Sequence, residues 1–135
     1  MTPGSRNRET ILLAEDDKAL RYLVARILRS GGYTVIEAVD GEDALECSAR
    51  HGRIDLLVTD MVMPKLGGVE LARRLCERDS DMRVMYMSGY PDPGLGKQSE
   101  FEPDASWVAK PFAASALLQE VRNRLDTPRA ARPRT

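Results

Sequence analysis

Polar residues that could carry chemistry follow four short apolar stretches of the sequence. Carboxylates follow two of these stretches, a hydroxyl follows a third and a lysine follows the fourth: Glu15-Asp16-Asp17, Asp60, Ser88-Gly89 and Lys110-Pro111. Carboxylates that lie close together raise each other's pKa, because like charges repel, and a hard divalent cation removes that cost. Mg²⁺ prefers oxygen ligands and is typically held by one or two carboxylates together with phosphate oxygens. If these residues meet in space, they could bind Mg²⁺ and support phosphoryl transfer to an aspartate.

The lysine and the serine fit the same chemistry. Lys110 would bring a compact positive charge to a phosphoryl oxygen, and Ser88 would donate a short-range hydrogen bond. The sequence contains no Gly-rich P-loop and no GxGxxG turn. His51 is the only histidine, and Cys47 and Cys76 are not spaced as metal ligands. The sequence therefore predicts two reduced thiols and no zinc site.

Each of these short patterns also has an ordinary structural explanation when it is taken alone. An acidic triplet after a strand is typical of a helix N-terminus, where carboxylates meet the positive end of the helix dipole. Asp60 could cap a loop, and Lys110-Pro111 could simply end a strand. All of these explanations would have to hold together at one edge of one sheet, which favours a functional site. Asp17 is interpreted as a helix N-cap and not as a ligand.

The elements that position these residues alternate along the chain. Apolar runs of strand length cover residues 10–14, 34–37, 56–59, 84–87 and 106–109, and amphipathic stretches cover residues 18–30, 41–50, 68–77 and 113–125. In the first stretch, Leu20, Leu23, Val24, Ile27 and Leu28 are predicted to form one buried stripe. Strands that alternate with helices predict parallel βαβ units, and so a small doubly wound α/β domain. The carboxyl ends of its strands, where the polar residues stand, are the expected site of function.

One segment departs from this alternation. Residues 90–104 read YPDPGLGKQSEFEPD, where a fourth helix is expected, and contain three prolines and two glycines. These residue types disfavour a helix interior. Only residues 97–101 could form about a turn, so the sequence predicts a short, shifted or mobile fourth helix.

Four motifs in order resemble one known family. ILLAEDD, LLVTDMVMPKLGG, MYMSGY and VAKPF look like the receiver domain of two-component response regulators, of the chemotaxis-regulator-like type and similar to receivers of hybrid sensor histidine kinases. The resemblance covers about residues 10–125, and four motifs in the right order are more specific than any one of them. It implies a flavodoxin-like fold with five parallel strands in the order 2-1-3-4-5.

The resemblance also implies roles for individual residues. Asp60 matches the phosphoacceptor, because Met63-Pro64 and Gly68 follow it at the family's spacing. The implied Mg²⁺ ligands are Glu15, Asp16, Asp60 and the backbone carbonyl of Val62. Lys110 matches the family's lysine, and the bond to Pro111 is expected to be cis.

Two further positions match the switch of the family. Ser88 matches the hydroxyl residue that turns toward the phosphoryl group. Trp107 stands where the family usually carries a Tyr or Phe that moves between outward and inward rotamers. Tryptophan is larger, so the alternative for Trp107 is a side chain half-buried on an edge strand.

The expected function is a phosphoacceptor switch and not an enzyme. A sensor histidine kinase or phosphotransfer protein would pass its phosphoryl group to Asp60, with only slow self-catalysed phosphorylation and dephosphorylation. Output would go to an unknown downstream protein, with no direct DNA binding, because ten residues follow Leu125. The chain could be a free-standing receiver or the receiver of a hybrid kinase.

Two other functions stay open on the sequence. An aspartyl-phosphate hydrolase would need a second acid two residues after its nucleophile, where this chain has Val62. A degenerate receiver would only bind a partner, although all five site positions are present here.

Bulk properties fit this interpretation. The 135 residues suit one domain, predicted over residues 10–126 between flexible tails at residues 1–9 and 127–135. The net charge of -1 gives no global field for nucleic acid or an anionic membrane. The first residues lack an apolar signal-peptide region, and no apolar run is long enough to cross a bilayer, so a cytoplasmic location is expected.

Overall fold

A five-stranded parallel sheet forms the centre of the protein in the computed structural model, which describes residues 9–61, 63, 65–78, 82–88, 106–109 and 113–126, with the backbone alone at residues 88 and 106–109. The strands are β1 (Thr10–Ala14), β2 (Thr34–Ala38), β3 (Leu56–Asp60), β4 (Arg83–Ser88) and β5 (Ser106–Ala109). Their order is β2-β1-β3-β4-β5, which confirms the predicted flavodoxin-like order.

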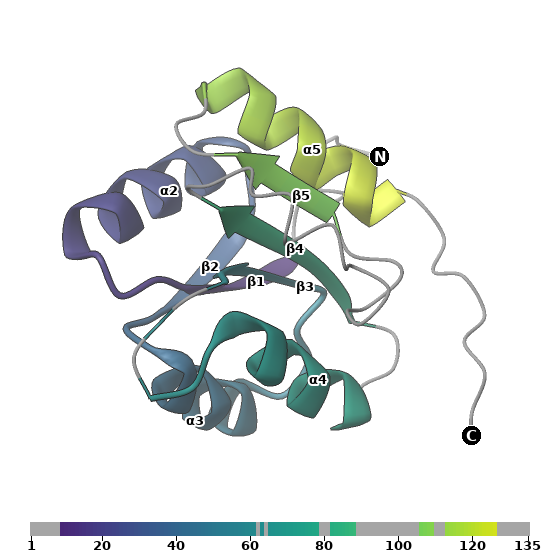
Figure 1. Ribbon diagram of the computed structural model, residues 1–135. Helices are drawn as coiled ribbons and strands as arrows, with labels where there is room; N and C mark the ends of the chain where they lie inside the picture. The colour runs from purple at the N-terminus through teal and green to yellow at the C-terminus, as the bar shows by residue number, and fades with distance from the viewer. Residues whose placement is uncertain are drawn as a thin grey trace.

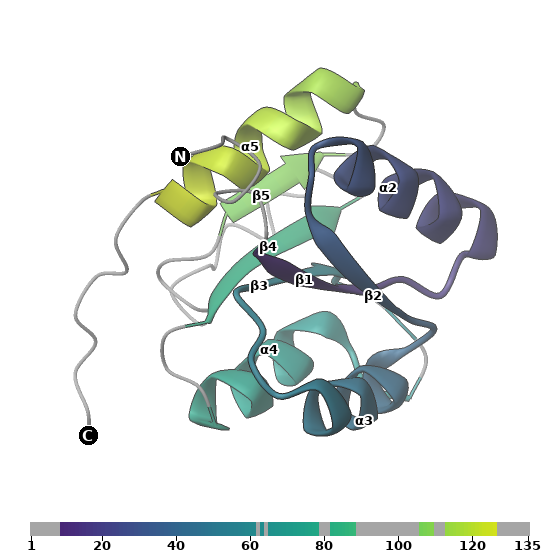
Figure 2. The same ribbon diagram turned by 180° about the vertical axis from the view of Figure 1, so that it is seen from behind.

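Among the described helices, two cover each face of the sheet (Figures 1 and 2). Helices α2 (Lys18–Ser30) and α5 (Ala114–Asp126) pack on one face, and α3 (Gly41–His51) and α4 (Gly68–Arg78) pack on the other. Alternate residues of β1 enter the two cores: Ile11 and Leu13 face α2 and α5, whereas Leu12 and Ala14 face α3 and α4. Burial on both faces explains why this strand is apolar throughout.

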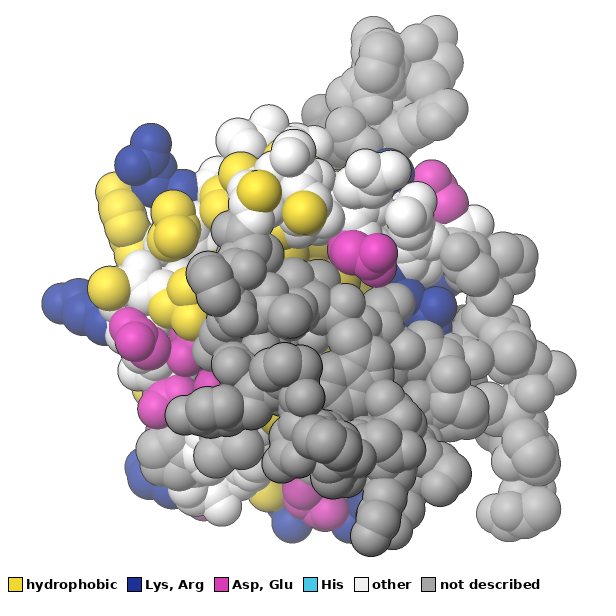
Figure 3. All heavy atoms as spheres, turned by 45° about the horizontal axis from the view of Figure 1, so that its top comes forward, with side chains coloured by type: hydrophobic (Ala, Val, Ile, Leu, Met, Phe, Trp, Pro, Cys, Tyr) yellow, Lys and Arg dark blue, Asp and Glu magenta, His cyan; other side chains and the backbone are white. Residues whose placement is uncertain are grey.

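The helix predictions are close to the observed bounds, with one correction on α2. Leu23 is 50% exposed and does not belong to the buried stripe, which instead includes Ala25. The buried positions centre on Val24 and Leu28, and Leu23 lies about 100° around the helix from Val24, which turns it to the surface. Figure 3 shows hydrophobic side chains exposed beside Lys and Arg side chains on this side of the molecule.

The loops at the carboxyl edge of the sheet lead directly into helices. Asp17 caps α2, because its side chain accepts a hydrogen bond of 3.1 Å from the backbone N–H of Leu20. Asp40 caps α3 in the same way, through the N–H of Asp43 at 2.8 Å. The cap at Asp17 confirms the sequence prediction, and the two caps together fix the two helix N-termini next to the strand ends.

The predicted fourth helix, within residues 90–104, lies outside the described residues. Among the described helices, none combines the length and apolar character that crossing a bilayer requires.

Candidate functional site: an acidic cluster at the carboxyl edge of the sheet

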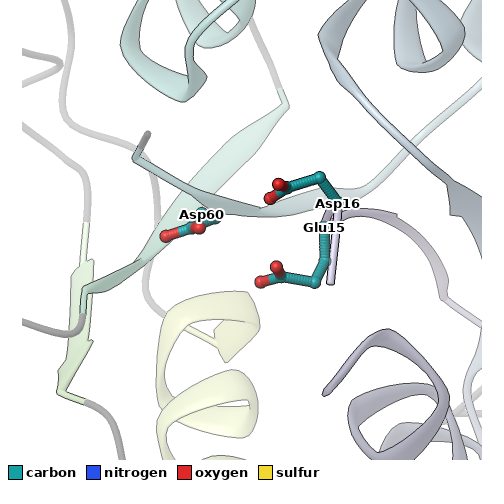
Figure 4. Close-up of side chains that lie close together, drawn as sticks. All are labelled: Glu15, Asp16 and Asp60. Atoms are coloured by element: carbon teal, nitrogen blue, oxygen red, sulfur yellow. The ribbon is translucent and has the colours of Figure 1, made fainter. Parts of the chain in front are cut away.

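Three carboxylates meet where β1 and β3 end. Strand β1 leads into Glu15 and Asp16, and the neighbouring strand β3 ends at Asp60. One carboxylate oxygen from each residue lies within 4.8 Å of the other two. Figure 4 shows the three side chains gathered at this edge of the sheet. The structure therefore brings together the three carboxylates that the sequence placed at a common site.

Glu15 is buried and is held through both its backbone and its carboxylate. The residue is 1% exposed, and its N–H donates to the carbonyl oxygen of Ala38 at the end of β2, at 3.1 Å. Its Oε2 accepts a hydrogen bond of 3.0 Å from the N–H of Asp17. Its own carbonyl oxygen accepts a hydrogen bond of 2.8 Å from Nη1 of Arg21. Both the backbone and the carboxylate of Glu15 are thus fixed before any ligand binds.

Asp60 is half-buried, and the backbone around it continues the sheet. The N–H of Met61 donates to the carbonyl oxygen of Met87 on β4 at 3.3 Å. The hydroxyl of Thr59, which is fully buried, donates to the carbonyl oxygen of Asp60 at 2.9 Å. These bonds hold the end of β3 in place, so the carboxylate of Asp60 projects from a fixed backbone.

The start of α4 lies against the same backbone. The N–H of Gly68 donates to the carbonyl oxygen of Met61 at 2.9 Å. A Cβ atom at Gly68 would overlap the carbonyl group of Asp60 and lie 3.1 Å from the Cα of Met61. Only a glycine lets the helix approach the strand end this closely.

The other predicted site residues are placed only in part. The backbone of Ser88 ends β4, one residue beyond Met87, which pairs with Asp60. Ser88 pairs with Ala109 at the end of β5, and the backbone of Trp107 pairs with Tyr86. Val62, Lys110 and Pro111 lie outside the described residues, so the predictions on the carbonyl ligand, the lysine and the cis peptide stay predictions.

The donors in this cluster suit a hard divalent cation. All three are carboxylates, and oxygen is the ligand atom that Mg²⁺ prefers. Glu15 is buried whereas Asp16 is exposed, so the cluster opens to solvent and leaves room for the water ligands that Mg²⁺ keeps. A cation would also relieve the repulsion between three like charges at this separation. The residues present therefore fit Mg²⁺.

Sequence reasoning missed two residues that support the site. Arg21 and Thr59 both bond to backbone carbonyls of acidic site residues. The sequence could have indicated Arg21, because this residue lies one helical turn after the cap residue Asp17. At that position its side chain can reach back to the start of α2. Thr59 was visible only as a strand residue, because its hydroxyl acts through the backbone of Asp60.

Comparison with known proteins agrees with this geometry. The family model of the response regulator receiver domain matches residues 11–122. The response regulator receiver protein CpdR of Brucella abortus (strain 2308) is 37% identical over 115 residues, which cover 85% of this chain and 95% of CpdR. The sensor kinase CckA of the same organism is 35% identical over 118 residues, which cover 87% of this chain but 12% of CckA.

Comparison with a solved structure shows the same family likeness in the fold. The crystal structure of the receiver domain from the hybrid histidine kinase CckA superimposes with a TM-score of 0.74 at 35% identity, covering 87% of this chain and 99% of that domain. The order of strands and the acidic cluster between β1 and β3 fit this likeness. The chain therefore belongs to the response regulator receiver domain family of two-component signalling.

Proposed function

We propose that Asp60 accepts a phosphoryl group from the phosphohistidine of a sensor histidine kinase or phosphotransfer protein. Receiver domains interact with such partners and bind Mg²⁺ at an acidic pocket. The observation that carries the proposal is the meeting of Asp60 with Glu15 and Asp16 within 4.8 Å at the carboxyl edge of the sheet.

The transfer is a displacement at phosphorus. A carboxylate oxygen of Asp60 forms a bond to the phosphorus atom while the bond from phosphorus to the histidine nitrogen breaks. The imidazole leaves with the electron pair of that bond. Asp60 is fit for this attack because its backbone is fixed by β3, and its side chain is half-buried but still reachable.

Mg²⁺ would be held by three carboxylates and one backbone carbonyl: Glu15, Asp16, Asp60 and the carbonyl of Val62. When bound, the ion supplies positive charge to the phosphoryl oxygens, which lowers the cost of charge in the transition state. Glu15 would stay in position to bind the ion, since its backbone and its carboxylate are both hydrogen-bonded. Lys110 and Ser88 are proposed to contact the phosphoryl oxygens from the ends of β5 and β4.

The new charge on Asp60 is proposed to shift a two-state equilibrium that Ser88 and Trp107 report to a downstream protein. Residues 10–126 are proposed as the unit that carries this switch, because the described elements run from Thr10 to Asp126. Self-catalysed dephosphorylation would be slow, so the domain stays a switch and does not turn over substrate.

Intact-mass measurement tests the proposal. Wild-type protein incubated with a small acyl phosphate and Mg²⁺ is expected to gain a single phosphoryl group, and Asp60→Asn is expected to gain none. Asp17→Asn is the matched control, because asparagine keeps the N-cap of α2 while one carboxylate next to the site is removed. An adduct of equal yield on Asp60→Asn, or release of many equivalents of phosphate by wild type, would contradict the assignment.

A further inference from the structure

The turn between β2 and α3 lies against the loop that follows Asp60. Gly41, the first residue of α3, is buried. A Cβ atom at this position would lie 2.6 Å from the Cβ of Leu66, and it would overlap the carbonyl oxygen of Leu66 even more closely. A Cβ atom does not approach non-bonded atoms this closely in proteins. Leu66 therefore occupies the space that any other side chain at position 41 would need.

Close approach is the reason for glycine at this position. Helix propensity would favour alanine over glycine at a helical position. A left-handed backbone does not explain the glycine, because among the described residues positive φ is confined to Gly32, Gly52 and Lys65. What remains is the contact with Leu66, which alanine would disturb.

A second contact joins the same two segments. Asp40 uses Oδ1 to cap α3, and its Oδ2 lies 3.6 Å from Nζ of Lys65. Lys65 has a φ of 70°, a conformation that residues other than glycine rarely adopt. The loop therefore has an unfavourable backbone conformation at Lys65, next to the position where Leu66 meets Gly41.

Both ends of this loop lie next to the phosphoacceptor. Met61 follows Asp60 directly, and the N–H of Gly68, where the loop meets α4, donates to the carbonyl oxygen of Met61. The carbonyl group of Asp60 fills the space that a Cβ at Gly68 would need. Met61 and Leu66 are both partly buried against the core between the sheet and helices α3 and α4. A displacement of Leu66 would therefore be passed to Asp60 through the packed residues Met61 and Gly68.

The segment from β2 to α3 also contacts the other half of the acidic cluster. The carbonyl oxygen of Ala38 accepts the hydrogen bond from the N–H of Glu15 at 3.1 Å. One short segment, residues 38–41, thus contacts the loop that carries Glu15 and Asp16 and the loop that follows Asp60.

From these contacts we propose that Asp40 and Gly41 are positioning residues for the phosphoacceptor loop. Their contacts with Lys65 and Leu66 set the separation between Asp60 and the Glu15–Asp16 pair, and this separation determines the affinity for Mg²⁺. The inference rests on the proposed function of the acidic cluster. Neither Asp40 nor Gly41 belongs to that cluster, so they act only through the loop.

Gly41→Ala and Asp40→Asn change the two contacts separately. Gly41→Ala pushes on Leu66, and we expect its dissociation constant for Mg²⁺ to rise about tenfold, as for other residues that orient metal ligands. Asp40→Asn keeps the cap of α3, since asparagine caps helices as well as aspartate does, but weakens the pairing with Lys65. Its dissociation constant is expected to rise in the same direction but less.

Gly52→Ala is the matched control. Gly52 follows the other end of α3, where its φ of 81° makes alanine unfavourable, and no atom lies within 4 Å of the position of a Cβ. This variant loses stability without touching the phosphoacceptor loop. We therefore expect it to keep the Mg²⁺ affinity of wild type.

The experiment is a calorimetric titration of Mg²⁺ into each variant of the 135-residue chain, at a temperature where all are folded. The amide signals of Leu66 and Gly68 in NMR spectra give a second readout of the loop. Intact-mass phosphorylation is measured in parallel. If wild type binds Mg²⁺ but gains no phosphoryl group, the proposed phosphotransfer fails, whereas the positioning inference is still decided by the titration.

Equal dissociation constants in wild type, Gly41→Ala and Asp40→Asn would overturn the inference, as would an equal loss in Gly52→Ala. If Gly41→Ala does not fold, Asp40→Asn is the test. An unchanged dissociation constant for Mg²⁺ in Asp40→Asn would then overturn the inference. A weaker affinity in both variants, together with shifted amide signals and an unchanged control, would support it.

Discussion

The guanidinium of Arg21 holds the backbone of Glu15 through a hydrogen bond of 2.8 Å from its Nη1 to the carbonyl oxygen of Glu15. Arg21 also lies 3.6 Å from Glu37 on β2, and its side chain is 14% exposed. The largely buried guanidinium of Arg21 thus joins α2, β2 and the loop that carries Glu15 and Asp16. The positive charge of Arg21 contacts the backbone carbonyl of Glu15 and so fixes the position of this residue.

Replacing Arg21 by alanine is expected to affect both stability and metal binding. The lost charge-assisted hydrogen bond should lower the free energy of unfolding by about 2 kcal/mol. The dissociation constant for Mg²⁺ should rise, because Glu15 loses one of the contacts that fix it. Urea unfolding and a Mg²⁺ titration measure the two effects.

Arg29→Ala is the control for that variant. Arg29 pairs with the same Glu37 at 3.0 Å and donates to the carbonyl oxygen of Val35 at 3.0 Å, but it does not contact Glu15 in the described contacts. It should lose stability and keep its Mg²⁺ affinity. If both variants weaken Mg²⁺ binding equally, the role of Arg21 at Glu15 is wrong.

Asp60→Asn is expected to stabilise the metal-free protein. Removal of one of three carboxylates that lie within 4.8 Å of one another relieves like-charge repulsion, which at partly exposed positions amounts to about 1 kcal/mol. The same change should reduce the rise in Tm that Mg²⁺ causes, because a ligand stabilises only in proportion to its affinity for the folded state. Thermal unfolding with excess chelator and with Mg²⁺ measures both. A wild-type Tm that does not respond to Mg²⁺ would contradict this prediction.

Arg122→Leu is expected to loosen α5. Arg122 donates to Glu9 at 3.0 Å and to the hydroxyl of Tyr33 at 3.2 Å, and it pairs with Asp126 at 2.9 Å. These bonds join the residue before β1, the turn before β2 and the end of α5. Their loss leaves polar groups of Glu9 and Tyr33 poorly paired, at a cost of about 2 kcal/mol.

Hydrogen exchange and urea unfolding would measure the loss. Tyr33→Phe removes only one of these bonds and keeps the ring beside the guanidinium of Arg122, whose centre lies 5.8 Å from the ring centroid. That variant should retain most of the stability. Faster exchange in α5 for Tyr33→Phe than for Arg122→Leu would contradict the proposed order of effects.

The thiol of Cys47 should resist alkylation in the folded protein. Burial raises the pKa of this thiol, and the nearby carboxylate of Asp43 raises it further. The folded state therefore keeps the proton to a higher pH than the unfolded state does. This contribution to stability is present below the unfolded thiol pKa and is lost as pH rises through the folded value.

Stability measured from about pH 8 upward should therefore fall less steeply in Cys47→Ala than in wild type. Alkylation at pH 8 should be slow in buffer and fast in concentrated urea. Fast labelling of Cys47 in the native protein would show that its burial at 4% exposure does not protect it.

Much of the fold could be predicted from the sequence, because its signals are local. The apolar runs and amphipathic stretches predicted strands and helices within a residue or two of their observed bounds, and Asp17 was recognisable as a cap. The strand order and the three acidic residues followed from the motifs and from the rule that parallel strands present their carboxyl ends at one edge. The predicted burial of Leu23 on α2 was wrong, because two neighbouring registers of one amphipathic helix differ little in sequence.

The contacts that position the acidic cluster were decided by the tertiary structure. Glycine at position 41 looks like an unfavourable helix residue until the backbone of Leu66 is found against it. Arg21 looks like a surface residue of an amphipathic helix until the carbonyl of Glu15 is found within hydrogen-bond distance. Sequence alone specified which residues could bind a cation, since that depends on residue type and strand end. How firmly they are held depends on close packing between segments distant in the chain, which no local pattern encodes.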